Sequence, residues 1–144
     1  MAHRAIDVAR YIVTKCTDDE CPISNLQLQK ILYYVQLNYF RKLGEWAFDD
    51  DMEAWQHGPV VPSVYREFMR GGSGEIIEFF FGIENIFYEE EREIIDRVTE
   101  KCRSLPPWEL VARTHRPGSP WDRVYKPGEK KVIPKEYIKE YARR

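Results

Sequence analysis

The chain has 144 residues, 43% of them apolar and 14% aromatic, which suits the core of one domain over residues 1–144 and argues against a second large domain. Its 22 lysines and arginines nearly balance 24 aspartates and glutamates, so the net charge of −2 excludes the basic excess of a protein that wraps nucleic acid. No apolar run approaches the roughly 20 residues of a membrane-spanning helix, and charges interrupt the N-terminal segment where a secretory signal would be apolar.

The first predicted element is an amphipathic helix over residues 5–16. Its apolar side chains recur every three or four positions, which places them on one helical face. The following segment, residues 17–22, contains three acidic residues and ends in a proline, so we expect a loop there.

A second, longer helix is predicted to begin at Ser24. Ser24 and Gln27 have the spacing of a capping box, in which the two residues satisfy each other's free backbone amides. The apolar stripe continues for about five turns, and Gly44 supplies a glycine stop. Aromatic residues fall on more than one face of this helix, which predicts burial on several sides and a central position.

The next segment changes its period. Residues 46–55 alternate apolar and polar side chains, which predicts a short β-hairpin that turns at the three aspartates 49–51. Three adjacent acidic residues at the tip of a hairpin favour an ordinary polar turn, and a site for a hard cation is the alternative. Pro62 and the glycines at 71 and 72 bound a third helix, and a glycine-rich link follows. The apolar run 76–83 is too short to distinguish a strand from a helix.

The C-terminal half is predicted to be mostly helical. Glutamates 89, 90, 91 and 93 precede an apolar stripe and favour the start of a helix, which the prolines at 106 and 107 end. A short helix follows, on which Trp108, Val111, Ala112 and His115 share a face, and a turn-rich link covers residues 116–121. Residues 132–133 favour an edge strand, and Pro134 begins a terminal helix. The expected fold is mainly α (α+β): a compact bundle of five to six helices around a long central helix, with a small β-hairpin.

Charge is segregated along the chain. Residues 73–100 carry nine acidic residues and two arginines, whereas residues 110–144 carry ten lysines or arginines and four acidic residues. We expect this basic segment to be a solvated face that folds back on the acidic helix, and contact with phosphate or with an oppositely charged protein is the alternative.

Motifs for catalysis are missing from the sequence. It contains no phosphate-binding loop, no dinucleotide-binding glycine turn, no serine nucleophile elbow and no metalloprotease histidine pair. The three cysteines are too widely spaced for a four-ligand zinc site, so we expect free thiols in a reducing cytoplasm, no metal and no cofactor. His57 and His115 lie next to tryptophan-bearing turns, where they favour a structural hydrogen-bonding role; a catalytic role in a tryptophan-lined cleft is the alternative. We assign no catalytic residue and do not expect an enzyme.

Two runs of residues resemble a known family. The run LQKILYY at 28–34 and the run EAWQHGPVVPSVY at 53–65 resemble the Panacea domain family, which includes SocA-like antitoxins and phage-associated GepA-type proteins. A histidine followed by a Pro-Trp pair, at 115 and 120–121, is similar to the family's C-terminal signature. The candidate structural or partner-binding residues are Leu28, Lys30, Tyr33, Tyr34, Trp55, His57, Gly58, Pro59, Val60, Tyr65, His115, Pro120 and Trp121.

The resemblance implies a mostly helical domain that acts as the antitoxin of a toxin–antitoxin pair, often encoded on a prophage or another mobile element. It implies a cognate protein toxin as the partner, with delivery of the toxin to a AAA+ protease as an alternative mode. It offers no catalytic residue. A regulator that binds nucleic acid through residues 113–144 is a further alternative, although we do not expect it. We expect Trp55, Tyr65 and Trp121 to be core residues that hold the Gly-Pro turn. They are also of the types that anchor protein interfaces, so contact with a partner is the alternative.

Overall fold

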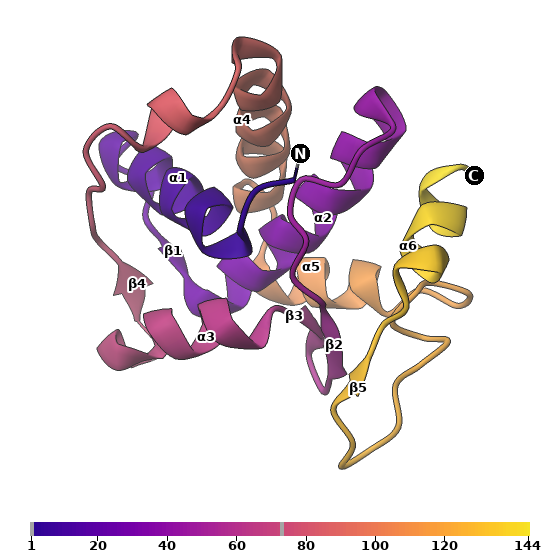
Figure 1. The fold of residues 1–144 in the computed structure, drawn as a ribbon. Helices are drawn as coiled ribbons and strands as arrows, with labels where there is room; N and C mark the ends of the chain where they lie inside the picture. The colour runs from indigo at the N-terminus through magenta and orange to yellow at the C-terminus, as the bar shows by residue number, and fades with distance from the viewer. Residues whose placement is uncertain (1, 73) are drawn as a thin grey trace.

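The computed structural model describes residues 2–72 and 74–144, so Ser73 of the predicted glycine-rich link lies outside the described residues. Within them, six α-helices pack together, and two small antiparallel sheets lie at the periphery (Figure 1). The mainly helical fold predicted from the sequence is confirmed. The helices are α1 (Ala5–Asp18), α2 (Asn25–Leu43), α3 (Pro62–Phe68), α4 (Glu89–Arg103), α5 (Pro107–Thr114) and α6 (Lys135–Ala142).

Helix α2 is the central element, as predicted. It packs against each of the other five α-helices, and Figure 1 shows it crossing the middle of the molecule. The predicted capping box is present: the Gln27 amide donates to the Ser24 hydroxyl at 3.2 Å, and the Ser24 amide donates to Gln27 Oε1 at 2.9 Å. Gly44 ends the helix with a φ of +68°, a conformation that costs glycine little.

Two small sheets flank the helices. One sheet pairs β1 (Ile23–Ser24) with β4 (Glu75–Ile76). The other has the order β3-β2-β5, in which the hairpin strands β2 (Glu53–Trp55) and β3 (Gly58–Val60) are joined by β5 (Lys131–Val132) at the edge. The edge strand predicted at residues 132–133 is therefore confirmed, one residue earlier in the chain.

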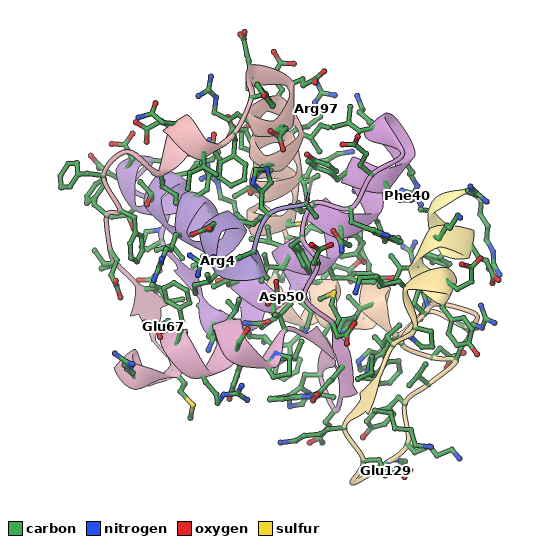
Figure 2. The ribbon with its side chains drawn as sticks, viewed as in Figure 1. Arg4, Phe40, Asp50, Glu67, Arg97 and Glu129 are labelled. Atoms are coloured by element: carbon green, nitrogen blue, oxygen red, sulfur yellow. The ribbon has the colours of Figure 1, made fainter. Side chains whose placement is uncertain are left out.

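The predicted turn of the hairpin is wrong. The strands turn at Gln56 and His57, and the aspartates 49–51 lie in the loop that precedes β2. Those aspartates are used in long-range contacts instead. Asp50 Oδ1 accepts the Ala5 amide at 2.8 Å, at the start of α1 (Figure 2), while Lys135 Nζ donates to Asp51 Oδ1 at 2.9 Å. The loop thus connects the first and last helices, which no local pattern reveals.

Two further expectations need correction. Helix α5 buries Leu110, Val111 and Thr114, whereas Trp108 is 63% exposed, so of the predicted face from Trp108 to His115, Val111 packs in the interior but Trp108 and Ala112 do not. The basic segment does not fold back on α4: among the described residues, every ion pair made by a basic residue of 110–144 ends on Asp51, Glu109, Glu129 or Glu140.

The remaining segments form short elements. The apolar run 76–83 forms neither a helix nor a long strand: only its first residue is in β4, and the 3-10 helix η2 (Ile83–Ile86) begins at its end. A second 3-10 helix, η1 (Met69–Gly71), follows α3. The three cysteines are free thiols. Among the described helices, none combines the length and apolar character needed to cross a bilayer.

Candidate functional site

Three polar side chains near the start of α2 bind the backbone of the hairpin and of α3. Lys30 Nζ donates to the Pro59 carbonyl at 2.9 Å, and Gln29 Oε1 accepts the Val61 amide at 2.9 Å. Asn25 donates to the Tyr65 carbonyl at 3.0 Å and accepts from Gln29 at 3.0 Å. All three side chains are buried, so these bonds satisfy backbone groups that water cannot reach.

Lys30 is the most unusual member of this group. Its side chain is 0% exposed, and its one hydrogen bond in the described structure goes to a carbonyl, without a carboxylate partner. Burial lowers the pKa of the Lys30 ammonium to about 7, because a charge is costly away from water. The residue therefore acts as a buried donor that is partly neutral near physiological pH.

Gly58 is explained by the close approach of α2 and α5. Its φ is +115°, and a Cβ there would lie 2.7 Å from Thr114 Oγ1 and 2.8 Å from Lys30 Cε. Both distances are shorter than real Cβ contacts, so a side chain at this position would force the buried side chains of Thr114 and Lys30 to shift. The Gly-Pro pair of the family signature is thus a point where three elements meet.

The residues of the C-terminal signature, His115 and Trp121, contact the same region. Trp121 Nε1 donates to the Trp55 carbonyl at 2.6 Å, and the His115 ring stacks on Trp121 with centroids 3.6 Å apart. Tyr125 also stacks on Trp121, at 4.5 Å. Burial, with a smaller contribution from the nearby Lys30, lowers the pKa of His115 below its ordinary value.

A cleft of about 600 Å³ lies beside this cluster. Trp55 and Tyr65 form part of its wall and meet edge to face with centroids 5.0 Å apart, and Lys130 Nζ lies 4.2 Å from the Trp55 ring centroid. The exposed His57 also borders the cleft, and its ring meets the Trp108 ring edge to face with centroids 5.2 Å apart. The hydrogen bonds of the described residues include none to the His57 ring and none to the buried Nε2 of His115.

The structure brings together most of the residues singled out in the sequence. Lys30, Gly58, Pro59, His115 and Trp121 are joined by the contacts above, with Trp55, Tyr65 and His57 around the cleft; Val60 and Pro120 are buried in the flanking segments.

Three candidates lie elsewhere. Leu28 is part of the hydrophobic core, and Tyr33 and Tyr34 pack against each other, at 5.1 Å. Tyr34 lines a separate hollow together with Arg113 and Arg116.

Sequence reasoning missed the buried amides of α2. Besides Asn25 and Gln29, Gln36 is buried; it donates to the Phe48 carbonyl at 2.9 Å and accepts the Ala47 amide at 2.9 Å. The three amides are four and seven residues apart, which places them on one side of a helix. The sequence does contain a signal for these buried amides: uncharged polar residues recur at helical spacing on a helix that is predicted to expose little surface.

A second missed group surrounds Glu91. Its carboxylate accepts from Tyr39, from the Tyr88 amide at 2.8 Å and from His3 at 2.7 Å. Burial by itself would raise the pKa of Glu91, but these hydrogen bonds outweigh it and keep the pKa below its ordinary value. Because His3 and Glu91 are 88 residues apart, no sequence pattern could have paired them.

Comparisons with known proteins agree with the motifs. The family model described as antitoxin SocA-like, Panacea domain, matches residues 28–122. The protein named antitoxin SocA from Caulobacter vibrioides (strain NA1000 / CB15N) is 34% identical over 127 residues, covering 81% of this chain and 68% of that protein. No solved structure matches the chain. The chain therefore belongs to the SocA-like antitoxin family with a Panacea domain.

Proposed function

We propose that this chain is the antitoxin of a toxin–antitoxin pair and that it neutralises a cognate protein toxin by direct contact. The observation that carries the proposal is the family match over residues 28–122, together with the 34% identity to a protein named antitoxin SocA. We further propose that the pair acts in the cytoplasm and is encoded on a prophage or another mobile element.

The geometry of the signature residues supports a binding role without catalysis. Three side chains, those of Lys30, Gln29 and Trp121, form hydrogen bonds with the backbone of the hairpin or of the segment next to it. Gly58 allows the elements to approach, and His115 is held flat against Trp121. Such a cluster makes the fold rigid, and a rigid surface loses little conformational entropy when it binds a partner.

Two modes of neutralisation are compatible with direct contact. In the first, the antitoxin covers the working surface of the toxin, and the toxin persists as a complex. In the second, the antitoxin is an adaptor that delivers the toxin to a AAA+ protease, and the toxin disappears. We propose the first mode, because a preformed, rigid surface is what a stable one-to-one complex uses.

The test is co-expression with the product of the neighbouring reading frame, each gene under its own inducible promoter. We expect this product to arrest growth alone, and we expect the chain to restore growth and to copurify with it. An empty vector is the control. The proposal fails if the product is harmless, or if growth returns without a complex.

Toxin abundance separates the two modes. An immunoblot after translation is stopped should show an unchanged toxin half-life when the antitoxin is present. If the toxin half-life is shorter and returns to normal in a strain that lacks the protease, the antitoxin delivers the toxin to the protease and does not act by covering its working surface.

A further inference from the structure

An exposed apolar segment lies far from the signature cluster. Residues 77–82, here called the strap, connect β4 to η2 along the outer side of α1 (Figure 1). Ile77 is 69% exposed, Phe79 51% and Phe81 97%. Soluble proteins rarely leave several large apolar side chains of one short segment in water unless they contact something else.

The strap is held in place and is not a loose loop. The Glu78 amide donates to Thr17 Oγ1 at 3.2 Å, and the Phe80 amide donates to Thr14 Oγ1 at 3.1 Å, so two hydroxyls of α1 fix its backbone. Phe80 points inward, where it packs against Phe68 with centroids 6.4 Å apart. The neighbours of Phe80 consequently point outward.

The two outward rings are arranged side by side. Phe79 and Phe81 have centroids 6.3 Å apart and planes only 19° from parallel. Because hydrogen bonds at Glu78 and Phe80 already hold the backbone, binding costs little backbone freedom in this segment, and exposed aromatic side chains of this kind supply much of the affinity of protein interfaces.

The surroundings of the rings are acidic. Residues 75–90 contain five glutamates and no lysine or arginine. Glu75, Glu78 and Glu84 are exposed, and within the described residues no ion pair occupies their carboxylates. A hollow of about 390 Å³ beside Phe79 and Phe81 is also lined by acidic residues, namely Asp18, Asp19, Glu84 and Asp96.

The cation in this hollow is already engaged. Lys15 lies 3.0 Å from Asp19 and 2.9 Å from Glu100, so it is paired within the chain. Asp19 is paired with Lys15 and Arg103, and Asp96 accepts from Tyr11, so the carboxylates without an ion pair in the described residues are those of Glu75, Glu78 and Glu84. The surface therefore combines two exposed rings with these three exposed carboxylates. Guanidinium groups match this combination, because they stack on aromatic faces and bind carboxylates through two parallel hydrogen bonds.

We propose that the strap is the toxin-docking surface and that it recognises a basic surface of the toxin, with arginines or lysines around an apolar hollow that receives Phe81. This inference rests on the proposed antitoxin function and adds the location of the contact and the chemistry of the partner. Charge complementarity also speeds the encounter of the two proteins and makes it sensitive to salt.

The test measures binding of the neighbouring reading frame's product to variants in and next to the strap and to matched controls. Phe81→Ser removes the most exposed ring, and the double variant Glu78→Lys with Glu84→Lys reverses the charge. Trp108→Ser, also an exposed ring, and Glu136→Lys, an exposed carboxylate on α6, are the controls. Circular dichroism melts establish that each variant is folded.

We expect Phe81→Ser to raise Kd at least about tenfold and to reduce growth rescue, while both controls bind like the wild type. The charge-reversed variant should bind at least about tenfold more weakly at low salt and lose the salt dependence that the wild type shows.

The outcomes distinguish this inference from the function on which it rests. If the wild-type chain neither binds nor rescues, the antitoxin function itself fails. If the wild type rescues and the strap variants do so equally well, the function stands and the docking surface is overturned. It is also overturned if sedimentation shows a dimer of the chain alone that Phe81→Ser dissociates while toxin binding is unchanged, because the strap would then be a self-association surface.

Discussion

The ammonium group of Lys30 couples folding to pH. Its pKa is 10.5 when exposed and about 7 in the folded chain, because burial disfavours the charged form. Between these values the unfolded chain holds a proton that the folded chain has released. Raising the pH from 7 to 10 therefore favours the folded state, and the penalty for burying the charge is fully present only below pH 7.

This difference predicts how Lys30→Met behaves. The free energy of unfolding of the wild type, measured relative to Lys30→Met, should rise by about 1.4 kcal/mol per pH unit across most of the range from pH 7 to 10. Urea denaturation at several pH values measures it. Asn85→Ala, which changes an exposed side chain that carries no ionisable group, should give a difference that does not depend on pH. Parallel curves for the wild type and Lys30→Met would contradict a buried, uncompensated ammonium.

Two glycines with positive φ provide a comparison at single residues. A Cβ at Gly44 meets nothing within 4 Å, whereas one at Gly58 collides with Thr114 and Lys30. Gly44→Ala should cost about 1 kcal/mol of stability through its backbone conformation alone. Gly58→Ala should cost about 2–4 kcal/mol because steric strain adds to that conformational cost. Thermal or urea unfolding of both variants checks this, and equal losses would show that the hairpin yields easily.

At the level of secondary structure, the loop before β2 caps a distant helix. Asp50 Oδ1 accepts the amide of Ala5, the first residue of α1, whose Arg4 N-cap makes no side-chain cap bond of its own. A carboxylate at this end also interacts favourably with the helix dipole. The loop thus replaces the local cap that the sequence before α1 lacks.

Removing this cap has a measurable cost. Asp50→Ala should lower the free energy of unfolding by about 0.5–2 kcal/mol, the range found for helix caps. Asp49→Ala is the matched control, since its side chain is exposed, and should stay within about 0.5 kcal/mol of the wild type. If the two variants lose the same amount, the contact with Ala5 does not stabilise α1.

The same elements show what the sequence could predict. The start and end of α2 depend on Ser24, Gln27 and Gly44, all within or next to the helix, so local reasoning finds them. The predicted hairpin lies too early in the chain because residues 46–55 alternate with the period of a strand. The aspartates in this segment instead bind residues that are 45 or more positions away in the sequence. Periodicity carries no information on such distant pairs.

The candidate site follows the same division. The signature residues were found by resemblance, but their roles depend on contacts between α2, the hairpin and the turn that follows α5. Asn25 and Gln29 were missed because a buried amide is recognised by its backbone partner, and that partner is visible only in the fold. The sequence does not distinguish a strand from a helix in the strap, because an apolar run does not reveal that alternate side chains face solvent.

At the scale of the whole molecule, the scaffold and the proposed docking surface are separate. The signature residues hold the hairpin on one side of α2, and the strap lies along the outer side of α1 (Figure 1). Charge is divided in the same way, since basic residues of 110–144 pair with acids of their own region or of the loop before β2, while Glu78 of the strap and the neighbouring Glu75 and Glu84 remain exposed. Such a separation lets the surface change with its partner while the packing contacts are kept.

Hydrogen–deuterium exchange of the free chain and of its complex with the toxin tests this separation most directly. In the free chain, the described structure gives the amides of Phe79 and Phe81 no acceptor, so they should exchange quickly. We predict that toxin binding slows exchange across residues 77–82 and leaves the hairpin at 53–60 unchanged. Slower exchange at the hairpin and the cleft, with no change in the strap, would contradict the account.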